Sequence, residues 1–325
     1  MGASLIEPHF EIQSYNMRKI RFSVYFLLTA FFILAIPQTP TAKAVSLSPL
    51  TFELSANPGD TVSNILKVTN TDPNPVNIVV DVEDFAAVGE EGQVTLLPGE
   101  DNSTYSLASW VTVSPSLLSI PAHDSATVEF TVNVPFGAEP GGHYGSVLAT
   151  VSTAPTPGAV TVAQKIGSLL LMNVAGDVEE RLHIAEFSVE PFSEYGPVTI
   201  LSRFENTGTV HLKPRGFILI KNMFGREVEK LDLPQKNVLP KSIRRIEVPW
   251  GNKLMFGRYE ATLTAIYGST NQPLSSVTTF WVIPWKIAGA ILIGLVALLS
   301  LLIKGRKRIR LALAVLFKGT HIYKV

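Results

Sequence analysis

The chain contains no cysteine among its 325 residues. A disulfide framework, a thiolate zinc site and a cysteine nucleophile are therefore excluded. Charge is also scarce: 17% of the residues are charged, and 27 basic side chains balance 27 acidic ones. A net charge of zero excludes a strongly basic nucleic-acid binder and a strongly acidic tail protein. A composition with so few charged residues indicates that membrane segments are joined to globular ones.

Motifs of catalysis and cofactor binding are absent as well. The histidines of the central region are isolated and lack the H-E-x-x-H spacing of a zinc site; they are His123, His143, His183 and His211. No G-x-S-x-G nucleophile elbow occurs. Gly141-Gly142 precedes a predicted strand rather than a helix, so it is not a phosphate-binding loop. We therefore predict a protein without enzymatic activity and without a cofactor.

The N-terminal region has the layout of a secretory signal peptide. A cluster of Arg18, Lys19 and Arg21 precedes the apolar stretch 22–36, and Ala42 and Ala44 supply the small residues of a cleavage site. We expect translation to begin at Met17 and cleavage to follow Ala44, which makes 1–44 an N-terminal extension and signal peptide. An uncleaved anchor is the alternative.

The C-terminal region predicts a membrane span at 284–303. Residues 287–303 carry no charge, and at about 1.5 Å per residue they would cover about 26 Å of bilayer. Trp285 and Lys286 suit the interface on one side, and a basic cluster follows on the other: Lys304, Arg306, Lys307, Arg308 and Arg310. By the positive-inside rule, 304–325 is a basic cytoplasmic tail, its end either a short interfacial helix or loosely ordered. The prediction is a single-pass type I protein of the cell membrane, with most of its chain extracytoplasmic.

Between these ends the hydrophobic pattern has a period of two. Apolar residues alternate with polar ones at 76–82, 126–134 and 259–267, with Val79 as an exception on the outer face. Such alternation indicates strands with one buried and one solvated face. Turn residues such as Asn57-Pro58-Gly59-Asp60 separate the runs. We predict an all-β fold of two tandem immunoglobulin-like β-sandwiches.

Three ordered landmarks occur in each half of this region. They are Asn70-Thr71-Asp72 and Asn206-Thr207-Gly208, Ile120-Pro121 and Leu239-Pro240, and Gly142-His143-Tyr144 and Gly257-Arg258-Tyr259. The apolar stretch 160–174 needs a partner, and we predict a hairpin with 143–152. The first sandwich is therefore assigned to 45–180 and the second to 181–283.

The neutral total hides a strong asymmetry between these segments. Residues 45–180 hold two basic and 16 acidic side chains, a net charge of −14. Residues 181–283 hold 13 basic and nine acidic side chains, and 284–325 hold eight basic and none acidic. The sequence thus predicts an acidic first sandwich, a mildly basic second one and a cationic end.

Candidate binding residues are few. Asp81, Glu83 and Asp84 are weak candidates for Ca²⁺ ligands, but without a D-x-D-x-D-G loop a solvated acidic face is the alternative. Asn102 begins a glycosylation sequon. Tyr105, Trp110 and Trp250 could present aromatic surface to a glycan or fill a sandwich core.

A set of short motifs resembles the WxL-interacting proteins of Gram-positive cell surfaces. These motifs are Ser48-Pro49, Pro58-Gly59-Asp60, Asn70, Asp84-Phe85, Pro121, Gly141-Gly142-His143-Tyr144-Gly145, Asn206, Leu239-Pro240, Gly257-x-Tyr259 and the C-terminal helix with its basic tail. The resemblance implies a first domain that binds peptidoglycan and a second that binds partner proteins. The acidity of the first domain does not fit peptidoglycan binding, because the anionic groups of the wall repel an acidic domain unless cations bridge the two.

The sequence therefore predicts a non-catalytic, membrane-anchored adaptor that holds extracellular protein partners, and peptidoglycan or another cell-wall glycan, at the envelope, with no role for nucleic acid. An alternative is a membrane-tethered assembly factor similar to pilus chaperones, which bind subunits by adding a strand. A third is an inert spacer. The ligand, the binding surface and the oligomeric state are left open.

Overall fold

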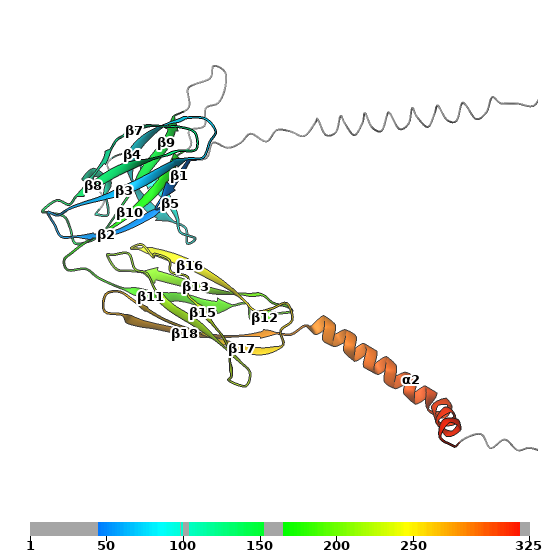
Figure 1. Cartoon of the computed structure of the whole chain (residues 1–325). Helices are drawn as coiled ribbons and strands as arrows, with labels where there is room; N and C mark the ends of the chain where they lie inside the picture. The colour runs from blue at the N-terminus through cyan, green and yellow to red at the C-terminus, as the bar shows by residue number, and fades with distance from the viewer. Residues whose placement is uncertain (1–44, 98, 100–103, 153–164, 319–325) are drawn as a thin grey trace, which may run out of the picture. The chain divides into compact units, whose positions relative to one another are not determined.

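The computed structural model describes residues 45–97, 99, 104–152 and 165–318, and from residue 307 on it describes the helix backbone alone (Figure 1). The predicted signal peptide, its cleavage site after Ala44 and the sequon residue Asn102 lie outside the described residues. So do the side chains of Lys307, Arg308 and Arg310.

The first sandwich consists of two sheets. One contains, in order, β1 (Val45–Ser48), β3 (Thr61–Asn70), β8 (Ser125–Asn133) and β6 (Val111–Ser114). The other contains β2 (Thr51–Ala56), β10 (Lys165–Val174), β9 (Gly141–Ser152), β4 (Val76–Val88) and β5 (Gln93–Leu97), with β7 (Leu117–Ile120) also paired to β4. A 3₁₀ turn, Ala108–Trp110, precedes β6.

The second sandwich repeats this topology. One sheet contains β11 (Leu182–Val189), β13 (Val198–Asn206) and β16 (Ser242–Trp250). The other contains β12 (Phe192–Ser193), β18 (Gln272–Val282), β17 (Gly257–Tyr267), β14 (Arg215–Asn222) and β15 (Glu227–Asp232). In each sandwich a strand near the start runs parallel to the last strand, β2 to β10 and β12 to β18. The predicted pair of immunoglobulin-like sandwiches is confirmed.

The period of two places one side of each strand in a core. In β4, Val76, Ile78 and Val80 are buried, while Asn77 and Val79 are exposed as predicted. Two large clusters of buried apolar residues result, one drawn from 45–174 and the other from 182–282.

The predicted hairpin is present, with β10 running antiparallel beside β9 from Lys165 opposite Thr150 to Val174 opposite Gly141. The run of β10 is apolar on both faces because both faces are covered. Leu170 and Met172 lie in the core of the first sandwich, and Leu171 lies in a separate cluster on the outer face.

The repeated Asn residues have the same structural role in the two sandwiches. Asn70 Nδ2 donates to the carbonyls of Asn74 and Pro121, each at 2.9 Å. Asn206 Nδ2 donates to the carbonyls of Val210 and Val238, each at 2.8 Å. Both residues are fully buried, so each side chain satisfies backbone carbonyls that would otherwise lack partners.

The C-terminal helix α2 extends over Trp285–Lys318. Its part Trp285–Arg306 is long and apolar enough to cross a membrane, and none of its most apolar window is buried. The helix continues through the basic cluster and into the tail, because residues 304–318 contain no proline and consist mainly of good helix formers.

Replacing Asn206 by alanine should lower the free energy of unfolding by about 1–3 kcal/mol, because buried carbonyls lose their donor. Asn70→Ala should do the same. Urea denaturation of the detergent-solubilised chain measures the change. The control Asn77→Ala, at an exposed position of β4, should stay within about 0.5 kcal/mol; equal losses for all three variants would contradict the assigned role.

Candidate functional site

The outer face of the β2–β10–β9–β4–β5 sheet carries a small buried apolar cluster. Phe85, Tyr144 and Leu171 form its centre and are at most 4% exposed. Leu239 of the second sandwich packs against it. The two sandwiches are therefore joined through apolar contact as well as through the chain.

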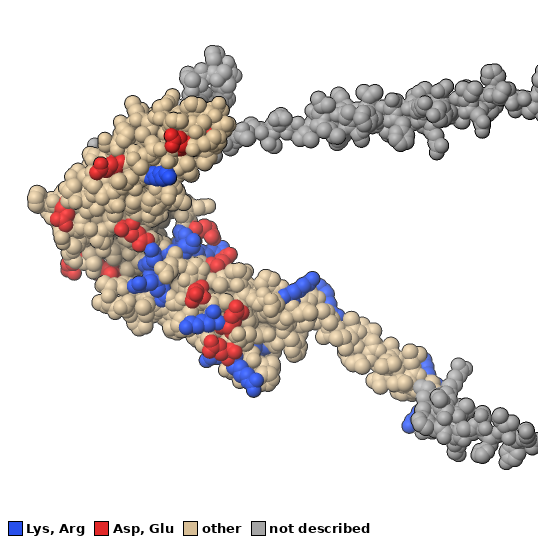
Figure 2. Space-filling view, in the orientation of Figure 1, with Lys and Arg blue, Asp and Glu red and all other residues tan. Residues whose placement is uncertain are grey.

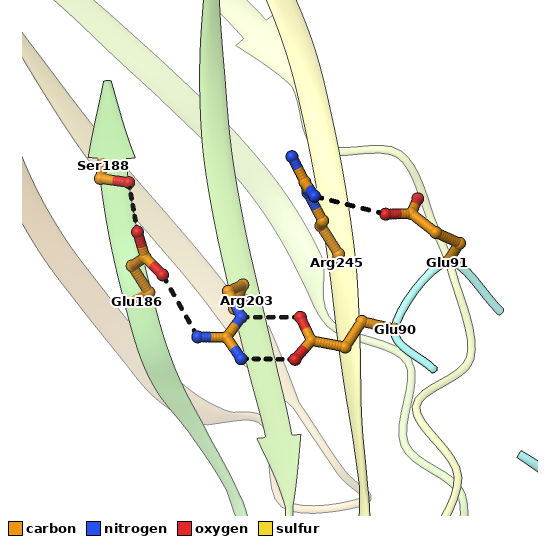
Figure 3. Close-up of polar contacts among 6 residues, drawn as sticks. All are labelled: Glu90, Glu91, Glu186, Ser188, Arg203 and Arg245. Carbon is orange, nitrogen blue, oxygen red and sulfur yellow. Dashed lines mark hydrogen bonds and ion pairs between the residues drawn. The ribbon is translucent and has the colours of Figure 1, made fainter. Parts of the chain in front are cut away.

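An ion-pair network links the β4–β5 turn to the β11–β13–β16 sheet (Figure 3). Glu90 accepts two hydrogen bonds from the Arg203 guanidinium, one from Nε at 2.7 Å and one from Nη2. Arg203 also donates to Glu186 at 3.2 Å, and Glu186 accepts from Ser188 at 2.7 Å. The backbone N–H of Arg245 donates to the Glu90 carbonyl at 2.8 Å, which adds a bond between main chains.

The network shifts the pKa values of its members toward the charged forms. Hydrogen bonds from Arg203 hold the pKa of Glu90 below its ordinary value, and those to Glu90 and Glu186 raise the pKa of Arg203. The Ser188 hydroxyl, followed by Arg203, lowers the pKa of Glu186. All three groups are therefore charged at neutral pH.

A second contact joins β2 to two segments of the second sandwich. Glu53 Oε1 accepts from Lys213 Nζ at 2.5 Å and from Asn237 Nδ2 at 2.7 Å. Burial alone would raise the pKa of Glu53, but these two hydrogen bonds outweigh it and the pKa is lowered.

A third contact lies at the start of β9. The Gly142 N–H donates to the Thr209 carbonyl at 2.9 Å, and the Tyr144 hydroxyl lies 3.4 Å from Nδ1 of His211. Burial raises the pKa of Tyr144 and lowers that of His211, so both side chains are held in their neutral forms.

A cleft of about 380 Å³, which we call the interdomain cleft, lies between the sandwiches and is lined in part by the second contact, Glu53 with Lys213 and Asn237. Its apolar lining is Phe85, Ala87, Val94, Leu169, Leu171, Leu239 and Ile243. Its polar lining includes Gln93, Gln235, Lys236 and Arg244. Gly92 borders the cleft with a φ of +82°, and a Cβ there would lie 1.2 Å from Nη1 of Arg244. The positive φ favours glycine at this position, and any larger residue would also displace the end of the Arg244 side chain.

Two polar atoms of the cleft are buried without a hydrogen-bond partner in the described part of the chain. One is a donor, Arg244 Nε, and the other an acceptor, Asn237 Oδ1. Burial lowers the pKa of Arg244, yet an arginine remains charged at neutral pH. The cleft thus combines an apolar surface with two lining residues, Asn237 and Arg244, that each hold a buried polar atom without a partner. Within the described ranges, no group of three or more His, Asp or Glu residues could hold a metal ion.

The calcium candidates have other partners. Lys165 Nζ lies 3.5 Å from Asp81 and 2.5 Å from Glu83. Asp84 is 2% exposed and accepts from the Leu107 and Ala108 N–H groups at 2.8 and 2.7 Å. Asp84 therefore fixes the turn before β6, and the alternative of a solvated acidic face is wrong for this residue.

The aromatic candidates pack within the protein. Trp250 is 4% exposed and contacts Tyr259 and Phe280 in the second core. Trp110 lies 4.3 Å from the His143 ring, and Tyr105 lies 6.3 Å from Tyr144, centroid to centroid. The core interpretation thus fits Trp250 directly.

At the predicted membrane flank, Trp285 is 56% exposed and Lys286 pairs with Glu194 at 2.7 Å. Lys304 and Arg306 lie on the helix after its apolar part.

Sequence reasoning missed the interdomain residues. The only available signal was the opposite net charge of the two sandwiches. Figure 2 shows acidic side chains spread over the visible face of the first sandwich, and both signs intermixed on the second. That asymmetry favours attraction between the sandwiches but does not identify the pairs.

Comparison with known proteins gives distant similarities of fold. No protein-family model and no curated protein matches the chain. The class 5 fimbriae chaperone CfaA is 13% identical, with a TM-score of 0.38, and the match covers 72% of this chain and 99% of that one. A chain of the Salmonella enterica SafA pilin–SafB chaperone complex is 14% identical with a TM-score of 0.36, covering 74% and 99%. The E. coli chaperone DraB is 13% identical with a TM-score of 0.33, covering 74% and 95%.

Arg203→Ala should loosen the joint between the sandwiches, because Glu90 and Glu186 both lose their guanidinium partner. The native chain lacks cysteine, so spin labels at Thr127→Cys and Thr279→Cys can report the distance between the sandwiches. The distance distribution should broaden in Arg203→Ala and broaden less in Arg203→Lys, since lysine cannot donate two parallel bonds. The control Arg215→Ala, at an exposed position, should leave the distance distribution unchanged. An unchanged width in Arg203→Ala would refute the role of Arg203.

His211 should make the folded chain less stable in mild acid. Its pKa is lowered by burial, so the unfolded chain binds a proton more readily than the folded one. This contribution is complete above the unfolded pKa of about 6.5 and is lost as the pH falls toward the lower folded value. Between about pH 7 and pH 5, the midpoint temperature of thermal unfolding should therefore fall more steeply for the native chain than for His211→Gln. Parallel curves would show that His211 does not contribute.

Proposed function

We propose that this chain is a membrane-anchored, extracytoplasmic protein-binding protein without catalytic activity, and that it holds an extended segment of a partner protein in the interdomain cleft. The observation that carries the proposal is the cleft itself, an apolar surface bordered by the unpaired donor Arg244 Nε and the unpaired acceptor Asn237 Oδ1. Its volume lies within the range of about 300–1,000 Å³ that is typical of ligand pockets.

A polypeptide segment fits this chemistry because each residue of its backbone carries one donor and one acceptor. Its apolar side chains would cover the partly exposed Val94 and Leu169 on one wall and Leu239 on the other. Each buried apolar side chain contributes about 1.5–3 kcal/mol to such binding before ordering costs are subtracted.

Strand edges at the cleft favour the same class of ligand. β5 is the last strand of its sheet and β16 the last of its own, although the Arg245 N–H of β16 already donates to the Glu90 carbonyl. Gln93 and Val94 of β5 and Ser242 of β16 line the cleft. An extended segment can add to such an edge through main-chain hydrogen bonds. By contrast, residues 169–174 of β10 pair with β2 on one side and β9 on the other, so that part of β10 has no free edge.

Membrane anchoring is the second part of the proposal. Trp285–Arg306 is the segment of the described chain that is long and apolar enough to span a bilayer. The cations that follow it, and the predicted signal peptide, favour a single-pass type I orientation with the cleft outside the cytoplasm. In this arrangement the protein is an assembly factor that presents a bound partner at the membrane surface.

The resemblance to WxL-interacting proteins supports a second candidate, a wall adaptor whose first sandwich binds peptidoglycan. The tandem sandwiches followed by an apolar helix favour it. The first sandwich, however, has a net charge of −14, and Trp110 and Tyr105 pack in tilted contacts against aromatic rings of their own chain. We therefore place the protein-binding cleft first and wall binding second.

Photo-crosslinking in living cells separates these functions. The photoreactive residue p-benzoylphenylalanine is placed at Gln93, an exposed residue of the cleft, or at Glu129, an exposed residue of β8. We expect discrete polypeptide adducts from position 93 and none from position 129. Adding Arg244→Ala should reduce the yield about tenfold, because a hydrogen bond to a charged group is worth about 1.5–3 kcal/mol. Arg215→Ala, outside the cleft, should leave it unchanged.

Three other outcomes would contradict the proposal. Adducts whose apparent mass falls after muramidase treatment would identify a glycan ligand and favour the wall adaptor. Equal adducts from both positions would show non-specific contact. Absence of adducts from either position would favour an inert spacer.

A further inference from the structure

One end of the second sandwich exposes large apolar side chains on three separate segments. Phe224 and Phe256 are 79% and 71% exposed, and Leu254 is 69% exposed. Met223, Phe192 and Trp281 are each about half exposed at the same end. Exposed apolar side chains gathered in this way mark an interaction surface.

Strand register places these segments together. β14 ends at Asn222, opposite Tyr259 near the start of β17. β17 begins at Gly257, opposite Val282 at the end of β18, and Phe192 of β12 lies opposite Trp281. The β14–β15 turn, the loop before β17 and the short strand β12 therefore surround the point where β18 ends. We call this group of segments the helix-proximal end.

The same point is where the chain enters its apolar helix. β18 ends at Val282 and α2 begins at Trp285, so the two ends are separated by at most about 11 Å of chain. Further contacts shorten the connection, since the Ile283 N–H donates to the Ser193 carbonyl at 3.0 Å and Lys286 pairs with Glu194 at 2.7 Å. A polar interfacial layer about 5–8 Å deep lies outside each face of the hydrocarbon core. Once α2 spans the bilayer, the helix-proximal end must lie at or close to this layer.

The side chains of this end suit a lipid surface. Aromatic and large aliphatic groups are those that insert into the boundary between headgroups and acyl chains. Charged residues of both signs accompany them: Lys221, Arg226, Lys253, Arg258 and Lys286, and Glu190, Glu194, Glu227 and Glu260. The basic side chains among them can meet anionic headgroups.

We propose that the helix-proximal end of the second sandwich is a membrane-docking surface, with Phe224 and Phe256 inserted into the interface of the bilayer that α2 spans. The proposal rests on the membrane anchoring proposed above. It assigns the occupant of this surface as lipid, because the apolar segments surround the point where β18 leads into the membrane helix. Docking would restrict the tilt of the second sandwich and hold the interdomain cleft at a set height above the bilayer.

The absence of native cysteine allows a direct measurement on the full chain. Single variants Phe224→Cys, Phe256→Cys and Leu254→Cys carry a nitroxide label in vesicles of phosphatidylcholine and phosphatidylglycerol. Phe136→Cys, at a residue of the first sandwich that is 91% exposed, is the matched control, and Leu298→Cys reports the helix. Collision rates with oxygen and with a water-soluble nickel complex give the depth of each label.

We expect the ratio of oxygen to nickel collisions at positions 224, 256 and 254 to exceed that at position 136 several-fold, and to be highest at 298. Ratios at the first three positions equal to that at 136, with 298 in lipid, would overturn docking and leave anchoring intact. A label at 298 exposed to water would instead overturn anchoring. Low accessibility to both reagents at 224 and 256, or dipolar broadening between labels, would identify a protein partner or a second copy and would also overturn lipid docking.

Discussion

The Arg203 guanidinium lies between Glu90 of the first sandwich and Glu186 of its own, and this shared cation links the two sandwiches. Arg203 and Glu90 are both about 30% exposed, so solvent weakens the attraction and the pair contributes modestly to stability. Its main effect is geometric, because two parallel hydrogen bonds allow one orientation. Burial of Phe85, Tyr144 and Leu171 supplies the apolar contact that this orientation permits.

Charge asymmetry and repeated topology together explain the interdomain cleft. The two sandwiches share the order of their corresponding strands, with β6 and β7 extra in the first. One is acidic and the other basic, so attraction operates between them rather than between like copies. Contact occurs at separate points, the β4–β5 turn, β2 and the start of β9. The surfaces between these points do not fit each other closely, and the cleft is the space that remains. Its residues come from both sandwiches, so its shape depends on the joint.

The order of elements along the chain connects the cleft to the apolar helix. The last strand of the second sandwich, β18, is followed directly by the apolar helix. The contacts of Glu90, Glu53 and Tyr144 connect that sandwich to the first. A chain held at its helix, at the exposed aromatic end and at the joint would have few remaining degrees of freedom. Such stiffness suits a protein that presents a bound segment at a surface, since preorganisation lowers the ordering cost of binding.

Features with a local cause were predictable from the sequence alone. Alternation at 76–80 predicted β4, the apolar run up to Val174 predicted the β9–β10 hairpin, and the uncharged run 287–303 predicted α2, because each pattern reflects burial of nearby residues. The paired Asn70 and Asn206 motifs likewise revealed the repeat. The partnership of Glu90 and Arg203, 113 residues apart, had no such signal, and neither had the burial of Asp84 or the unpaired Arg244 Nε. These depend on which surfaces pack together, so the sequence determined the two sandwiches and only the tertiary structure decided the cleft between them.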